Sequence, residues 1–465
     1  MSSTASSEEI KRFMPYLLAT AIFMQMLDST ILNTALPAIA EDLNEPVLNM
    51  QSAIISYVLT LALFIPVSGY MADRFGTKKI FITALILFSL GSLFCALSQN
   101  LLQLDISRVF QGLGGALMTP VARLSMLKTY PKGEIVRAMN YAIVPALIAP
   151  ILGPLIGGYM VEWVSWHWIF LINIPMGIIG VIFSLRYMPD YKEKNPRLDV
   201  KGFFIFGAAS LLLSVALELL GHRSNTTIML ALLMSGFMML YFYFRHAQKN
   251  IEALFPLHLM KVRTFRVGVI GNLMTRVGIS SIPLLIPLLI QIAFERSPST
   301  AGWIVVPMAL AAMFGKTLVL PVMNKFGYRN TLRFNTGMLG ILIMSLAIPS
   351  LNTNILWYIP VMFFMGILNS IQFTAMNAIA ISDLRDYQNS SGNSLLTVNQ
   401  QLAIGFGIAI GMSVLTLFQN QLGTGKHEVH LAFRLTFITV GFLTFLSAFI
   451  FRGLHAKDGD NLKTG

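Results

Sequence analysis

The segment Gly69-Tyr-Met-Ala-Asp73-Arg74-Phe75-Gly76-Thr-Lys78-Lys79 joins two apolar stretches that are each long enough to cross a lipid bilayer. Glycine permits close helix contact at position 69 and a tight turn at position 76. Asp73 can accept hydrogen bonds from a neighbouring helix N-terminus or from an arginine. An ordinary basic loop of a membrane protein would account for the Lys and Arg residues, but not for Gly, Asp and Gly at this spacing. The spacing therefore indicates a specific motif.

The same pattern returns later in the chain. Met71-Ala-Asp73-Arg74-Phe75-Gly76 recurs as Val322-Met-Asn324-Lys325-Phe326-Gly327, an offset of 251 residues (322 − 71). The second copy has Asn324 in place of the acid and Leu320 in place of the first glycine. We therefore expect any gating contact made by this loop to be weaker in the second half than in the first. The repeat predicts two like halves related by a pseudo-twofold axis along the membrane normal.

Composition requires lipid as the main solvent of this chain. The 465 residues are 55% hydrophobic and only 12% charged, and the mean hydropathy is +0.68. That leaves too little polar surface to coat a soluble globule of this size. The single cysteine, Cys95, lies within an apolar run and excludes a disulfide framework and a zinc ligand spacing.

Hydrophobic runs of spanning length predict fourteen transmembrane helices in an all-α membrane protein. The polar Met1–Arg12 segment leads into a first run that is too long for a signal-peptide core, so we expect an uncleaved anchor. The runs cover residues 15–37, 50–71, 79–98, 104–127, 138–161, 166–188, 203–220, 227–245, 266–292, 301–323, 331–349, 357–381, 393–418 and 431–453.

Charge tests this topology independently, because Lys and Arg favour cytoplasmic loops. With both termini in the cytoplasm, most of the 33 Lys and Arg fall inside. The basic residues left outside are Arg223, Arg296, Lys426 and Arg434, and those within spans are Arg108, Arg123, Arg276 and Lys316. An even number of spans is the simple arrangement that gives this bias.

The expected organisation is therefore six helices, two extra helices and six helices. It has a cytoplasmic N-terminus (1–14), an N-terminal half (15–188), a linker with two extra spans (189–265), a C-terminal half (266–453) and a cytoplasmic tail (454–465). Only Gly221–Thr226 separates the two extra spans, which is enough for a tight reversal.

Four further segments carry a resemblance. They are Leu27-Asp28-Ser29-Thr30-Ile31-Leu32-Asn33-Thr34-Ala35-Leu36-Pro37, Arg108-Val-Phe-Gln111-Gly112-Leu-Gly114-Gly115, Gly153-Pro154-Leu-Ile-Gly157-Gly158 and Trp166-His167-Trp168-Ile-Phe-Leu-Ile-Asn173-Ile-Pro175. Together with the 69–79 loop they resemble the major facilitator superfamily, in particular its fourteen-span drug:proton antiporters of the EmrB/QacA type. The resemblance covers nearly the whole chain.

The resemblance implies proton-coupled export of lipophilic or amphipathic compounds across the bacterial inner membrane. It makes Gly69, Asp73, Arg74, Gly76, Lys78 and Lys79 a gating loop, and Gly153, Pro154, Gly157 and Gly158 an antiporter motif. We expect no cofactor beyond the proton gradient and no nucleic-acid partner. The partners would be the bilayer, protons and small-molecule substrates, and an outer-membrane or adaptor partner cannot be read from the sequence.

Asp28 is the candidate proton carrier, because an ionisable residue within a span normally faces a cavity or a partner. It is the only acidic residue well inside the spans of the first half, and Arg108 is the obvious cation at a similar depth. Two interpretations stay open. The pair either couples protons to transport or is a fixed ion pair that holds the first and fourth spans together.

Arg276, Lys316, Gln111 and Arg123 are predicted to line the substrate cavity. Arg276 has the clearest case, because it lies about ten residues into its span, whereas Arg123 and Lys316 can snorkel toward a helix end. With Arg108 neutralised by Asp28, the remaining cations favour anions or neutral molecules as substrates.

Other functions remain as alternatives. A membrane enzyme would need clustered His and Asp or a nucleophile with its base, and the seven His form no such cluster. A passive channel or a non-transporting sensor would not need an embedded acid. An exporter of one endogenous metabolite stays open. No G-x-x-x-x-G-K-[ST] loop is present, so ATP is not the energy source.

Overall fold

The computed structural model describes residues 6–193, 198–221, 226–250, 253–385 and 388–462. These residues form helices and connecting turns without a β-strand, which confirms the all-α prediction. Two compact units divide the chain, Met1–Leu198 and Asp199–Gly465, and each is described by itself.

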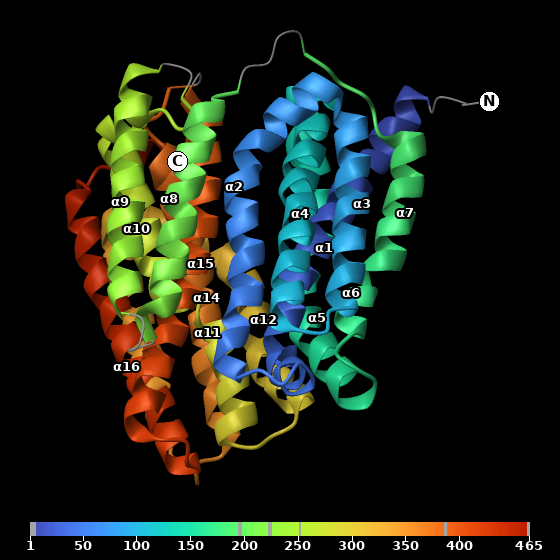
Figure 1. The fold of residues 1–465 in the computed structure, drawn as a ribbon. Coiled ribbons are helices and arrows are strands. Elements are labelled where there is room, and N and C mark those ends of the chain that lie inside the picture. The colour runs from blue at the N-terminus through green and yellow to red at the C-terminus, as the bar shows by residue number, and fades with distance from the viewer. Residues whose placement is uncertain (1–5, 194–197, 222–225, 251–252, 386–387, 463–465) are drawn as a thin grey trace. The chain divides into compact units, whose positions relative to one another are not determined.

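The first unit contains six long helices and one short one (Figure 1). In chain order they are α1 (Ser7–Asp42), α2 (Gln51–Phe75), α3 (Thr77–Ala96), α4 (Leu101–Thr129), α5 (Lys132–Trp163), α6 (Trp168–Leu171) and α7 (Asn173–Tyr187). The most extensive contacts join α1 to α5, α3 to α4 and α2 to α4. Helices α1 and α4 are therefore the centre of this unit, with the others packed around them.

The second unit holds the remaining helices. They are α8 (Val200–Glu218), α9 (Thr226–Lys249), α10 (Arg263–Ile279), α11 (Ile282–Leu288), α12 (Pro298–Phe326), α13 (Tyr328–Ser345), α14 (Tyr358–Ile381), α15 (Asn389–Leu422) and α16 (Lys426–Ser447). Helix α12 packs on α14, α13 on α16, and α10 on α15. The 3-10 helix η8 (Ala448–Gly453) continues α16.

Twelve segments of the described chain are long and apolar enough to cross a membrane, judged by length and composition. One of them, Pro298–Ser345, contains both α12 and α13, which meet at Gly327. The 29-residue helix α4 is not among the twelve.

The first helix begins earlier than its hydrophobic run predicts, at Ser7 rather than near residue 15. A capping box explains the difference. The Ser6 side chain accepts from the Glu9 amide at 3.2 Å, and the Glu9 carboxylate accepts from the Ser6 amide at 2.9 Å. These bonds satisfy exposed backbone donors, so a polar segment can start a helix that hydropathy alone does not reveal.

The internal repeat is confirmed at its two glycines. Gly76 has φ +102° and Gly327 has φ +72°, conformations that favour glycine over residues with a side chain. Each ends one long helix, and the next begins at the following residue, Thr77 or Tyr328. The offset of 251 residues thus relates the α2–α3 turn to the α12–α13 turn.

The extra helices α8 and α9 pack on each other, and α8 also packs on α15. Asp199 caps α8 and accepts hydrogen bonds from the Gly202 amide at 3.0 Å, His246 at 2.8 Å and the Leu254 amide at 3.1 Å. Burial raises the pKa of Asp199, but these bonds outweigh it, so the pKa lies below its usual value. The reversal expected at Gly221–Thr226 lies mostly outside the described residues.

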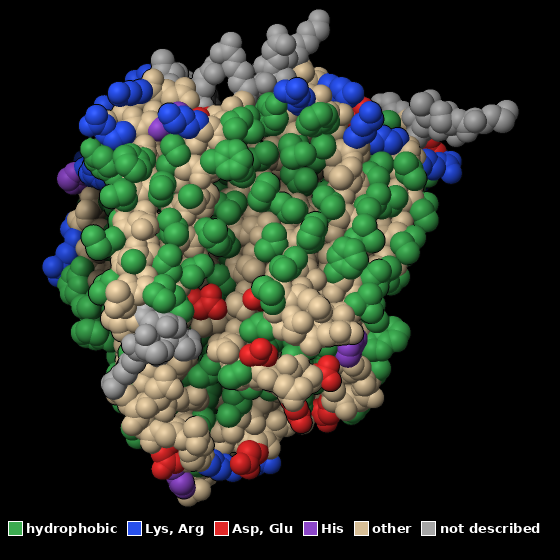
Figure 2. Space-filling model, viewed as in Figure 1, with side chains coloured by type: hydrophobic (Ala, Val, Ile, Leu, Met, Phe, Trp, Pro, Cys, Tyr) green, Lys and Arg blue, Asp and Glu red, His purple; other side chains and the backbone are tan. Residues whose placement is uncertain are grey.

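The faces and the ends of the first unit differ in polarity. Hydrophobic side chains cover the visible faces of α2, α3 and α7, and Lys and Arg gather at the end where α2 passes into α3 (Figure 2). Apolar faces of this kind are suited to lipid, and the basic end to an aqueous layer with anionic headgroups.

Glycines bring α1 and α5 together. A Cβ built at Gly157 would lie 2.5 Å from the Ile31 carbonyl oxygen and 2.6 Å from Thr34 Oγ1, so only glycine fits this contact. Gly153 faces Thr30 on the same side of α1, and Pro154 and Gly158 are buried. Close helix packing is therefore one established role of the Gly153–Gly158 motif.

We expect Gly157→Ala to lower the unfolding midpoint of the purified protein, because the added methyl group forces α1 and α5 apart at a cost of about 1–3 kcal/mol. Gly69→Ala is the matched control. In the described part of the first unit nothing lies within 4 Å of a Cβ at Gly69, so that variant should unfold at the wild-type midpoint or slightly above it. Thermal unfolding in detergent measures both, and equal destabilisation would contradict the packing argument.

Candidate functional site

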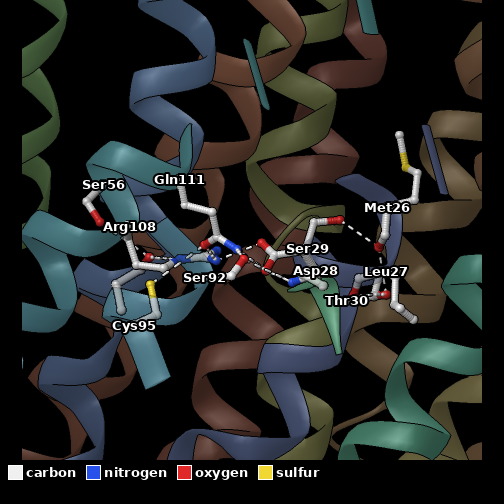
Figure 3. A network of polar contacts seen from close by, with 12 residues as sticks. Met26, Leu27, Asp28, Ser29, Thr30, Ser56, Ser92, Cys95, Arg108 and Gln111 are labelled. Carbon is white, nitrogen blue, oxygen red and sulfur yellow. Dashed lines mark hydrogen bonds and ion pairs between the residues drawn. The ribbon is translucent and has the colours of Figure 1, made fainter. Parts of the chain in front are cut away.

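Asp28 and Arg108 form a buried ion pair between α1 and α4. The Arg108 Nη1 and Asp28 Oδ2 atoms are 2.7 Å apart, and the two side chains are 1% and 0% exposed (Figure 3). The predicted pairing is confirmed. Both charges are removed from solvent, so their stability depends on the groups that surround them.

Asp28 receives further hydrogen bonds from other helices. Its Oδ1 atom accepts from Gln111 Nε2 at 2.6 Å and from Asn173 Nδ2 at 3.3 Å. Gln111 Nε2 also lies 2.8 Å from the Ser92 hydroxyl (Figure 3). Residues from α4 and the first turn of α7 thus bond to the Asp28 carboxylate, and Ser92 of α3 bonds to Gln111. We call these residues, together with Arg108, the Asp28 network.

The guanidinium of Arg108 is held on several sides. Its Nε donates to the Ala53 carbonyl at 3.0 Å, and its Nη1 donates to Gln111 Oε1 at 2.5 Å. The ring of Tyr57 lies 4.2 Å from the guanidinium carbon, close enough for a cation–π interaction. Arg108 therefore keeps several partners besides Asp28.

Gln111 differs from its predicted place. We expected it in a substrate cavity, but it is fully buried, and both ends of its amide are occupied within the Asp28 network. Glycines explain how it can be enclosed. A Cβ at Gly91 of α3 would lie 2.5 Å from the Gln111 amide nitrogen, and one at Gly114 would lie 2.5 Å from the Phe88 amide nitrogen.

Sequence reasoning missed three polar residues here. Ser92 and Asn173 belong to the network, and only Asn173 stood in a quoted motif. Asp105 was passed over, although it lies one turn before Arg108 on α4 and accepts from the Ser52 hydroxyl at 2.9 Å. Asp105 lies at the start of the span predicted at 104–127, whereas α4 begins at Leu101, one turn earlier.

The 69–79 loop forms a latch at the end of α4. Asp73 Oδ1 lies 3.2 Å from Lys128 Nζ, so its partner is a lysine in the last turn of α4 rather than a helix N-terminus or an arginine. Lys128 also contacts Glu193 at 2.8 Å. The close helix contact expected at Gly69 is absent among the described residues of the first unit, where nothing lies within 4 Å of a Cβ built at this position.

The basic residues of the loop have different environments. Lys78 Nζ donates to the Leu185 carbonyl at 2.6 Å, which ties the start of α3 to the end of α7. Arg74 donates to the Tyr70 hydroxyl at 2.6 Å on an exposed surface, and Lys79 is exposed. Among the described residues of the first unit, Lys78 is therefore the one of these three with a contact to another helix.

The chain that follows α7 covers this loop. Residues 189–193, which we call the strap, exchange hydrogen bonds with Thr77 through the Pro189 carbonyl and the Tyr191 backbone. The Glu193 amide donates to the Asp73 carbonyl at 3.0 Å. The strap and the latch thus share Asp73, Thr77 and Lys128. In the second unit, Asn324 is exposed, and its side chain makes no hydrogen bond among the described residues.

The other embedded cations have different surroundings within their own units. Arg276 on α10 donates to Asn272 Oδ1 at 2.6 Å and stacks on the Phe373 ring at 4.7 Å, without an ion pair in the part of the chain that the structure describes. Arg123 on α4 and Lys316 on α12 have exposed side chains. Arg276 and Lys316 belong to the second unit, and Arg123 and Gln111 belong to the first, so their grouping in one substrate cavity stays a prediction.

These features define a class of protein. Long apolar helices, two units with a repeated helix–glycine–helix turn and a polar network buried among apolar helices are typical of polytopic membrane transporters. Among the described residues no group of His, Cys, Asp or Glu could hold a metal ion.

Comparisons with known proteins give the family. The model of the Major Facilitator Superfamily matches residues 18–408 and 268–464, and the chain belongs to that superfamily. It is a transporter and not an enzyme.

Similar relatives are named for transport. The chain is 40% identical to a "Putative multidrug resistance protein MdtD" of Serratia proteamaculans, over 96% of this chain and 94% of the relative. It is 39% identical to a "Probable transport protein HsrA" of Haemophilus influenzae, over 97% and 98%. A crystal structure of the peptide transporter POT in complex with sulfate matches with a TM-score of 0.70 at 14% identity, over 99% and 100%, and supports the fold alone.

We expect Asp73→Asn to reduce transport several-fold, because a neutral amide holds Lys128 less strongly than a carboxylate does. Asn324→Ala is the matched change in the second copy and should leave transport near wild type. Uptake into everted vesicles, normalised to the amount of protein in the membrane, compares the two. Equal damage from both variants would show that the second copy matters as much as the first.

Proposed function

We propose that this chain is a proton-coupled secondary exporter of lipophilic or amphipathic small molecules that works by alternating access. The observation that carries the proposal is the buried Asp28 network, which places one titratable carboxylate against one arginine inside the helices. The multidrug names of relatives about 40% identical over nearly the full length support the substrate class.

The network has the parts that coupling needs. Protonation of Asp28 removes its charge and therefore its attraction for Arg108. Arg108 would still hold the Ala53 carbonyl, Gln111 and the face of Tyr57, so the ion pair can open without leaving the guanidinium bare. A conformational change that admits water from one side at a time would then let Asp28 load and release a proton.

The fixed ion pair is the competing role. Removing one partner of a buried pair costs about 3–5 kcal/mol, whereas replacing both with neutral groups can cost far less. A purely structural pair would therefore affect folding first, and transport only through folding. A variant in which both Asp28 and Arg108 are neutral separates the two roles. It should transport if the pair is only structural, but not if coupling requires the titrating carboxylate.

We further propose fourteen spans, with both termini on the cytoplasmic side of the bacterial inner membrane. The twelve candidate segments become fourteen when α12 and α13 are counted separately and α4 is added, which supports this number. The spans group as an N-terminal half (15–188), a linker with two extra spans (189–265) and a C-terminal half (266–453). The basic end of the first unit would face the cytoplasm, as Lys and Arg do in membrane proteins generally.

The latch and the strap would control the cytoplasmic side. Their contacts converge on Lys128, so movement of α4 relative to the 69–79 loop must break bonds to both Asp73 and Glu193. The Gly153–Gly158 motif would act with them as the joint between α1 and α5. With the exception of Gly69, the residues of the gating loop and of the antiporter motif therefore retain the roles proposed for them.

We expect Asp28→Asn to abolish proton-coupled export while the protein still inserts in the membrane, because asparagine keeps the size and one acceptor oxygen but cannot titrate. Proton flux on adding substrate to everted vesicles is the measurement. The control is Asp28→Asn combined with Arg108→Gln, which should recover stability but not transport. Full efflux by Asp28→Asn would rule out this carboxylate as the proton carrier.

We also expect weak organic acids and neutral amphiphiles to be exported in preference to quaternary ammonium dyes. Arg276 has no acidic partner among the described residues, so it can attract an anionic substrate. Arg276→Gln should then weaken apparent affinity for acids by about tenfold, and Lys316→Gln, at an exposed position, by less. Export of ethidium-like cations that is robust and unchanged in Arg276→Gln would contradict this preference.

A further inference from the structure

Two grooves flank α13 in the second unit. One, of about 400 Å³, lies between α13 and the α16–η8 segment, and the other, of about 500 Å³, lies where α13 meets α12 and α14. Asn330 and Phe334 line both grooves. The Phe334 side chain is 70% exposed, so it forms a ridge between two hollows.

The first groove is apolar along most of its length. Its lining on α13 runs from Asn330 to Ile341, which at about 1.5 Å per residue is roughly 16 Å. That is about half the ~30 Å hydrocarbon core, the depth of a single leaflet. A Cβ built at Gly337 would meet only the Phe445 ring, at 3.7 Å, so glycine keeps the groove hollow there.

One end of the grooves is positively charged. Arg333 lines the first groove one turn from Asn330, and Arg452 lies over the Phe449 ring at its edge, 4.3 Å away. Lys325 lies over the ring of Phe326, which lines the second groove. No ion pair is recorded for these three cations within the described residues, and neither lining contains Asp or Glu.

A second polar feature lies at the same end. The hydroxyl of Thr331 lines the second groove and is buried without a hydrogen-bond partner in the described chain. Asn330, which both grooves share, adds an amide that can donate to an oxygen acceptor. The first turns of α13 therefore offer cations and hydrogen-bonding groups above two apolar channels.

The internal repeat does not explain the grooves and cations around α13. By the offset of 251 residues, Arg333 corresponds to Ile82 on α3, Phe334 to Thr83 and Gly337 to Ile86. The counterpart helix thus lacks the cation, the ridge and the gap. These features belong to α13 itself rather than to the general shape of a half.

We propose that α13 binds one anionic phospholipid, with an acyl chain in each groove, Phe334 between the chains and the phosphate at Asn330 and Arg333. A guanidinium pairs strongly with phosphate oxygens, and basic clusters at helix ends attract anionic headgroups. A first groove of single-leaflet depth, a second groove beside it and a cationic end favour a two-chain lipid over a free anion. The site is independent of the proposed transport function.

The test titrates the delipidated full-length protein with phosphatidylglycerol and phosphatidylcholine and follows binding by native mass spectrometry. Phosphatidylglycerol should bind more tightly. Arg333→Gln should weaken its binding roughly five- to tenfold and reduce the preference over phosphatidylcholine. Gly337→Leu should weaken both lipids, because it fills the first groove without changing charge.

Arg296→Gln is the matched control, since it removes the same charge from an exposed position away from α13 and should leave binding unchanged. Unfolding midpoints show that the variants remain folded. Equal binding of the two lipids by the wild type, or wild-type affinity in both groove variants, would overturn the proposal. Competition by glycerol 3-phosphate as strong as that by the lipid would identify a free-phosphate site and also overturn it.

Discussion

The ion pair between Asp28 and Arg108 is the constraint on which the first unit depends. Two opposite charges buried at 2.7 Å are stable only if their other hydrogen-bonding positions are filled. Gln111, Asn173 and the Ala53 carbonyl fill them, and Ser92 in turn accepts hydrogen bonds from Gln111 and Asn173. The helices α2, α3, α4 and α7 must therefore all pack close to this ion pair.

Convergence at such short range requires glycine. Gly91, Gly112 and Gly114 let α2 and α3 approach α4, and Gly157 does the same for α5 against α1. The motifs that carry the family resemblance therefore have a packing role in this chain as well as any role in transport. The sequence alone does not show whether a glycine is needed for packing or for a turn. Gly76 is required by its positive φ, whereas Gly69 has no such conformation.

In both units the chain after the last helix returns to the repeated turn. The strap binds Thr77 in the first unit, and in the second Gly459 packs against Tyr328, with Asp458 bonded to Arg263 at 2.6 Å. The latch itself is not repeated, since Asp73 pairs with Lys128 whereas Asn324 is exposed. The two units thus share the backbone arrangement of the repeated turn but carry different charged residues around it. Helices α13 and α3 differ in the same way.

The sequence by itself determined the membrane class, the apolar helices, the repeated turns at Gly76 and Gly327 and the pairing of Asp28 with Arg108. These follow from hydropathy, from a fixed offset and from the rarity of charge within spans. Only the tertiary structure decided that Gln111 is enclosed, that Lys128 is the partner of Asp73, and that Ser92, Asn173 and Asp105 lie near the pair. Such contacts depend on the rotation and depth of each helix, and packing between helices sets both, which a hydropathy pattern does not encode.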